Sequence, residues 1–138
     1  MNMRSTPRAR ATLAAVAAIT FGAAVVTAAR AASVLDFDVW MRAIDKHSVD
    51  VQKNLEAHQP EAAAADAQEL SRLYGLMTQY FVDDGHAADA VEFSRGGKAL
   101  ADAIPPAIAA GDFDAASKAA LDLSHACNDC HDVHKPFQ

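Results

Sequence analysis

The sequence predicts an all-α protein, an antiparallel four-helix bundle, and three observations support this prediction. Residues 32–138 are dense in Ala together with Leu, Glu, Asp, Lys and Gln, and they contain few Gly, a composition that favours helix. Apolar residues recur there at spacings of three and four, and no long run alternates as a β-strand would. Four such segments of about twenty residues, each about 30 Å long, are joined by short connections, as in a helical bundle.

Residues 1–31 are predicted to be a cleaved secretory signal peptide. Arg4, Arg8 and Arg10 precede an uncharged apolar run that extends to Ala29, and small residues follow. We expect cleavage after Ala31. An uncleaved anchor is the alternative, because the run approaches the roughly 20 residues that span a bilayer, but its Ala-rich character favours cleavage. We therefore expect an exported, periplasmic protein with no stable membrane span, whose residues 32–138 form one domain.

The first predicted helix runs from about Asp36 to Ala57 and ends near Pro60. Its apolar residues share one face, because they alternate between spacings of three and four. Most of its charged residues lie off that face. The stripe consists of Val34, Phe37, Met41, Ile44, Ser48, Val51 and Leu55.

The second predicted helix begins near Pro60, since proline is tolerated in a first turn where its missing N–H would be unpaired anyway. It fades at Asp83-Asp84-Gly85, where glycine can end a helix in a left-handed conformation. Its apolar stripe consists of Ala63, Ala67, Leu70, Tyr74, Met77 and Phe81.

The third predicted helix covers roughly Ala87 to Ile104, and Pro105-Pro106 is expected to stop or kink it. The pair Gly96-Gly97 lowers its stability but lets another backbone or a flat ligand approach closely. Its apolar stripe consists of Ala90, Phe93, Gly97, Leu100 and Ile104.

The fourth predicted helix begins at Gly111-Asp112, the clearest boundary in the chain. Glycine closes the preceding turn, and the Asp112 carboxylate can accept hydrogen bonds from the free N–H groups of the first helical turn. One face of this helix carries Phe113, Ala116, Ala120, Leu123, Cys127 and Cys130.

The strongest functional signal is the Cys-x-x-Cys-His sequence formed by Cys127, Cys130 and His131. Cys127 and Cys130 are the only two cysteines of the chain. In this spacing the two thiols add to the vinyl groups of a haem, and the adjacent imidazole becomes an axial ligand of the iron. The motif predicts one covalently attached haem c, which stays bound even where the core is too small to enclose it.

Three other interpretations of the motif are less well supported. A redox dithiol normally begins a helix after a β-strand, and no strand is predicted before Cys127. Structural zinc needs four ligands, which Cys127, Cys130, His131 and His134 could supply only by crowding onto neighbouring helical turns. A structural disulfide would close a loop of two intervening residues and stabilise little.

Together these features resemble the class II c-type cytochromes, the family that includes cytochrome c′ and cytochrome c-556. The resemblance covers residues 32–138 and is carried by the C-terminal Cys-x-x-Cys-His, by the Gly-Asp start of its helix, and by a basic residue four positions after the histidine. That basic residue is Lys135, which the resemblance places at the haem. The family commonly has an aromatic residue just before it, whereas this chain has His134.

The resemblance also assigns a role to Met41 on the first helix. Members similar to cytochrome c-556 use a methionine there as the sixth iron ligand, whereas cytochrome c′ has an apolar residue and five-coordinate iron. The resemblance therefore implies a six-coordinate haem with His131 and Met41 as its ligands. Two alternatives remain open: Met41 as a core residue, and Met77 as a rival ligand at the same end of the bundle.

We expect an electron carrier and not an enzyme, because no nucleophile with a paired base is evident in the sequence. The alternative is a cytochrome c′-like protein that binds nitric oxide or carbon monoxide at a five-coordinate haem. A structural bundle without haem would leave the cysteine motif unexplained.

The charge of the chain indicates its partners. Loss of residues 1–31 leaves eight basic residues against 18 acidic ones, a formal charge of −10. Such acidity disfavours nucleic acid and steers a basic redox partner toward the protein, although it could also serve solubility alone. The sequence leaves open whether the protein forms a homodimer.

Overall fold

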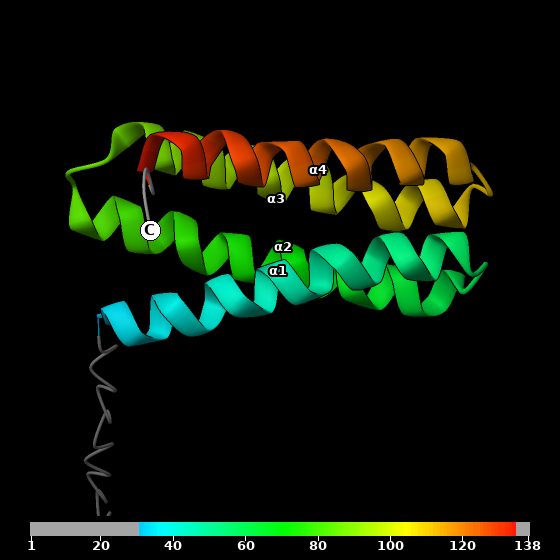
Figure 1. Ribbon diagram of the computed structural model, residues 1–138, viewed down its shortest axis with the longest axis horizontal. Helices are drawn as coiled ribbons and strands as arrows, with labels where there is room; N and C mark the ends of the chain where they lie inside the picture. The colour runs from blue at the N-terminus through cyan, green and yellow to red at the C-terminus, as the bar shows by residue number, and fades with distance from the viewer. Residues whose placement is uncertain (1–30, 135–138) are drawn as a thin grey trace, which may run out of the picture.

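The computed structural model describes residues 31–134, which fold into four helices around an apolar core (Figure 1). The helices are α1 (Val34–Glu56), α2 (Pro60–Asp84), α3 (Ala88–Ala109) and α4 (Phe113–His134), and no strand occurs among the described residues. The predicted all-α four-helix bundle is confirmed. Residues 1–30 of the predicted signal peptide, and Lys135, lie outside the described residues.

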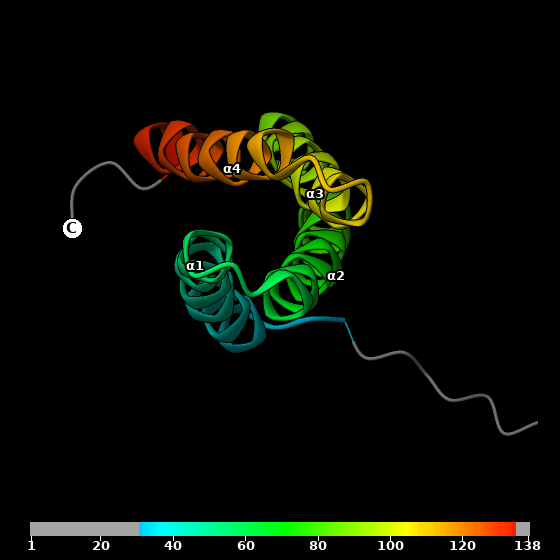
Figure 2. The same ribbon diagram turned by 90° about the vertical axis from the view of Figure 1, so that its right-hand side faces the viewer.

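Successive helices run in opposite directions, so the first turns of α1 and the last turns of α4 lie at the same end of the bundle (Figure 1). Each helix packs closely against the next one in the chain, and α1 and α4 have the least extensive packing of the neighbouring pairs. Seen from the end of the bundle, the four helices form an incomplete ring with α1 and α4 on either side of its opening (Figure 2). We call this junction the α1–α4 seam.

Helix α1 begins earlier than predicted because Ser33 and Asp36 form a reciprocal capping box. The Asp36 backbone N–H donates to Ser33 Oγ at 3.2 Å, and the Ser33 backbone N–H donates to the Asp36 carboxylate at 2.8 Å. These two bonds satisfy backbone donors that have no partner within the helix. The helix therefore starts at Val34, ahead of the expected start near Asp36.

Glycines close two of the helices, as the sequence predicts. Gly85 ends α2 with φ of +70°, and its N–H donates to the carbonyl of Phe81 at 3.1 Å. Gly111 has φ of +74°, and the Asp112 carboxylate accepts the N–H of Ala115 at 2.9 Å at the start of α4. A left-handed backbone is strained for any residue with a Cβ, which explains glycine at both positions.

The predicted end of α3 at Ile104 is wrong, because the helix continues through Pro105 and Pro106 to Ala109. Proline removes backbone donors, but its φ of about −65° is compatible with helix, so the chain can resume the helical ladder beyond it. The helical hydrogen bonds resume after the prolines, where the N–H of Ala110 donates to the carbonyl of Pro106 at 3.0 Å. Ile104 is completely buried, and this burial anchors the segment on the core.

The buried core follows the predicted stripes through the middle of the bundle and loosens toward one end. Phe37, Met41 and Phe81, which approach the end where α4 finishes, are only half-buried and pack against the edge of the core. Val34 and Phe113 are exposed although they belong to the predicted apolar faces of the first and fourth helices. The main core cluster consists of Ile44, Val51, Leu55, Ala63, Ala67, Leu70, Leu73, Tyr74, Met77, Ala101, Ile104, Ala116, Ala120 and Leu123.

Across residues 31–134, none of the helices combines enough length with enough apolar character to cross a bilayer.

Candidate haem-attachment site

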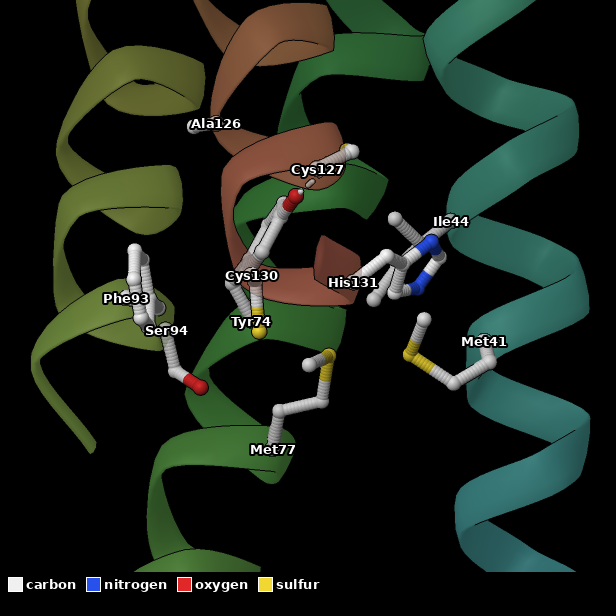
Figure 3. Close-up of a pocket in the computed structure, with 10 residues that line it drawn as sticks. All are labelled: Met41, Ile44, Tyr74, Met77, Phe93, Ser94, Ala126, Cys127, Cys130 and His131. Carbon is white, nitrogen blue, oxygen red and sulfur yellow. Dashed lines mark hydrogen bonds between the residues drawn. The ribbon is translucent and has the colours of Figure 1, made fainter. Parts of the chain in front are cut away.

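All four helices contribute to a pocket at the end of the bundle where α1 begins and α4 finishes (Figure 3). The side chains leave little free volume in it, about 20 Å³, whereas ligand pockets typically measure roughly 300–1,000 Å³. The pocket is lined by Met41, Ile44, Tyr74, Met77, Phe93, Ser94, Ala126, Cys127, Cys130 and His131. Four of the five site residues predicted from the sequence are therefore brought together here.

The two cysteines lie one helical turn apart on the pocket face of α4. Both are half-buried free thiols, and their spacing of three residues aligns them on one side of the helix. Burial raises the pKa of the Cys130 thiol, and the neighbouring Cys127 and Asp89 raise it further. Reactive redox thiols instead depend on a lowered pKa, so the environment of Cys130 is unlike that of a redox dithiol.

Cys127 has a specific partner on the facing helix α2. The hydroxyl oxygen of Tyr74 lies 3.2 Å from Cys127 Sγ, and Tyr74 is only 5% exposed. Burial raises the pKa of the Tyr74 hydroxyl, and the two nearby cysteines raise it further. The phenol therefore keeps its proton at neutral pH and can donate it to the sulfur.

The ring of Tyr74 reaches this position because Gly97 of α3 lacks a side chain. A Cβ placed on Gly97 would stand 2.4 Å from Tyr74 Cε1, whereas a Cβ on Gly96 would meet nothing within 4 Å. The close approach that the glycine pair predicts is therefore made at Gly97, by the flat ring of a tyrosine. The close fit holds the ring against α3.

His131 and Met41 face each other across the pocket. Figure 3 shows the imidazole of His131 extending from α4 toward α1, where Met41 and Ile44 lie. The Met41 thioether points into the same space, and the thioether of Met77 enters from α2. The structure thus brings the predicted axial pair together and places the rival methionine beside it.

His134 lies next to the pocket and packs on α3. Its Nε2 atom is 3.0 Å from the Asp89 carboxylate, and its ring packs edge-on against Phe93 with the centroids 6.2 Å apart. In the part of the chain that the structure describes, no three His, Cys, Asp or Glu side chains gather closely enough to hold a metal ion. His134, the fourth ligand that a zinc site would need, is therefore hydrogen-bonded to the Asp89 carboxylate of α3.

The donor groups around the pocket are those that would hold a covalently attached haem. Two free thiols share one helix face, an imidazole follows directly in the chain, and a thioether lies opposite. Imidazole and thioether are the ligand pair found in electron-carrying c-type haem proteins. The remaining lining residues are mostly apolar, as a porphyrin face requires.

Part of the pocket is not predicted by the sequence. The sequence predicts Tyr74 only as a core residue and does not single out Ser94, whose buried hydroxyl donates to the carbonyl of Ala90 at 2.7 Å. Tyr74 meets Cys127 across 53 positions of sequence. A single sequence contains no signal for such a contact between helices, apart from the glycine at position 97 that leaves room for a ring.

Comparison with known proteins adds no further assignment. No protein-family model matches the chain. Neither a curated protein nor a solved structure matches it significantly. The function is therefore inferred from the residues of the pocket and their arrangement.

Proposed function

We propose that the protein is an exported mono-haem c-type cytochrome, similar to class II members, that transfers electrons and is not an enzyme. The supporting observation is that Cys127, Cys130, His131 and Met41 converge on one pocket. A bound haem c supplies an iron that alternates between the ferric and ferrous states. No substrate chemistry is required of the surrounding residues.

Each residue has a distinct task in this proposal. Cys127 and Cys130 would hold the group by thioether bonds, and His131, directly after Cys130, would ligate the iron through a neutral imidazole nitrogen. Met41 of α1 would supply a soft thioether ligand, which favours the ferrous state. The resemblance to class II members would add Lys135, which lies outside the described residues, to the residues at the haem.

A second function is a candidate because Met41 packs against the apolar core. If its thioether stays there and does not reach the iron, the iron would be five-coordinate and would bind a diatomic gas such as nitric oxide or carbon monoxide. The two functions differ in the coordination number of the iron. Absorption spectra of the oxidised, the reduced and the carbon monoxide-treated protein distinguish six-coordinate from five-coordinate iron.

The proposal is tested by producing the full chain in a host that attaches haem to exported cytochromes. We expect one haem to stay with the polypeptide through acid and organic extraction, because thioether bonds survive both treatments. The double substitution Cys127→Ser and Cys130→Ser should abolish this retention. The substitution His134→Ala, next to the motif, is the control and should preserve it. Complete loss of haem from the unaltered protein into the organic phase would contradict covalent attachment.

A further inference from the structure

The two cysteines of the pocket differ in their hydrogen bonding. Cys127 Sγ lies 3.2 Å from the hydroxyl of Tyr74, whereas no hydrogen bond to Cys130 Sγ occurs within residues 31–134. A phenol is a far better donor than a thiol, so the Tyr74 hydroxyl donates and the sulfur accepts. The contact fixes the direction of the Cys127 side chain.

This hydrogen bond does not require a free thiol. An accepting sulfur uses a lone pair, and a thioether sulfur keeps its lone pairs when the thiol hydrogen has been replaced by carbon. The donor is also held in place, because the Tyr74 ring lies against Gly97 with no room for a Cβ. Tyr74 is therefore anchored by α3 while it reaches toward α4.

We propose that Tyr74 is a positioning residue that orients Cys127 Sγ, and through it one edge of the haem, in the pocket. The part that concerns haem rests on the proposed function. In this role Tyr74 would act on the haem through the Cys127 sulfur atom and would not ligate the iron. Loss of this donor should free the Cys127 side chain and leave Cys130 unaffected.

The test compares Tyr74→Phe with Tyr80→Phe, a matched pair because the chain contains only two tyrosines. Both variants lose one hydroxyl and keep the ring. Tyr80 stacks on Phe37 with the ring centroids 4.8 Å apart. Within residues 31–134 it makes no hydrogen bond to either cysteine. Tyr80→Phe therefore reports the general effect of losing a tyrosine hydroxyl.

The measurement depends on the state in which the full chain is purified. If haem is attached, we expect Tyr74→Phe to lower the reduction potential of the iron and Tyr80→Phe to leave it unchanged. The reason is that a hydrogen-bond donor to the Cys127 sulfur withdraws electron density from the porphyrin, and Tyr74→Phe removes this donor. If the thiols are free, proton coupling constants should show one Cys127 rotamer in the unaltered protein. The ratio favouring that rotamer should fall about fivefold in Tyr74→Phe, as expected for losing one hydrogen bond.

Each result decides between positioning and ordinary core packing. An unchanged potential in haem-bearing Tyr74→Phe, or unchanged Cys127 couplings in its thiol form, overturns the inference. Equal effects of both variants overturn it as well. A chain that never retains haem refutes the proposed function, and the coupling constants then still decide whether Tyr74 positions Cys127.

Discussion

At the scale of single residues, the sequence is most informative where chemistry depends on local spacing. Cys127, Cys130 and His131 lie within five consecutive positions, so one turn of helix determines their arrangement, and the structure places them on one pocket. The position of Met41 near His131 depends on the antiparallel directions of α1 and α4, and Met41 also lines the pocket. Tyr74 could not be assigned, because its contact with Cys127 depends on the relative position of two helices.

Substitution at Gly97 should destabilise the bundle far more than the same change at Gly96. A Cβ on Gly97 would overlap the Tyr74 ring at 2.4 Å, whereas a Cβ on Gly96 meets open space. Overpacking of a core typically costs about 1–3 kcal/mol. Alanine in place of glycine in an exposed helical position instead gains up to about 1 kcal/mol. Urea unfolding of Gly97→Ala and Gly96→Ala measures the difference, and equal midpoints would show that the ring can move away freely.

Met41 should be the sixth ligand of the iron, with Met77 as its rival. In Met41→Ala we expect the ferric protein to lose its Met–iron charge-transfer band, become high-spin and bind carbon monoxide readily. The reduction potential should also fall, since soft thioether ligation stabilises ferrous iron. Met77→Ala is the control, because its thioether lines the same pocket. The reverse outcome assigns Met77, and an unaltered protein that is already high-spin leaves Met41 as a core residue.

At the scale of the helices, ends that are specified by single residues could be predicted. Pro60, Gly85 and Asp112 each act within one turn, and each stands where the sequence places a boundary. The end of α3 could not be predicted from Pro105, because the burial of Ile104 and the packing of α3 on its neighbours outweigh the lost backbone bonds. Tertiary packing thus overrides a local signal there.

The pairing of α2 with α3 should weaken in acid because of a polar cluster formed by Ser71, Lys98 and Asp102. Hydrogen bonds from Lys98 and then Ser71 lower the pKa of the Asp102 carboxyl below its ordinary value. A lowered folded-state pKa stabilises the protein above the unfolded-state pKa, and this contribution is lost as the pH falls through the folded-state value. Solvent screening keeps it below about 1 kcal/mol, since the Asp102 side chain is 49% exposed.

The acid effect is measured by urea unfolding at pH 7 and pH 3. We expect Asp102→Asn to be less stable than the unaltered protein at pH 7 and nearly equal to it at pH 3. Asp122→Asn is the control, because Asp122 pairs with Lys118 within α4. If both variants show the same pH dependence, the contact between α2 and α3 contributes nothing.

At the scale of the whole molecule, net charge should govern association with a basic redox partner. The predicted charge of −10 for residues 32–138 implies that the association rate falls steeply as salt rises. Asp83→Asn with Asp84→Asn removes two charges near the pocket end of the bundle, and Glu61→Gln with Asp114→Asn removes two at the opposite end. Stopped-flow reduction by a basic redox protein should slow more in the first pair. A rate that is insensitive to salt would mean that the acidity serves solubility only.

The α1–α4 seam has a consequence for how the molecule opens. Since α1 packs mainly on α2, its amide protons should exchange with deuterium by local detachment before those of α2 and α3, which pack on each other most extensively. Residues on both sides of the seam, Met41 and His131, converge on the pocket. A group bound between them would link α1 to α4 and slow exchange in the first half of α1, which itself carries no covalent attachment. The cofactor would then stabilise the fold directly, because it would hold α1 and α4 together across the seam.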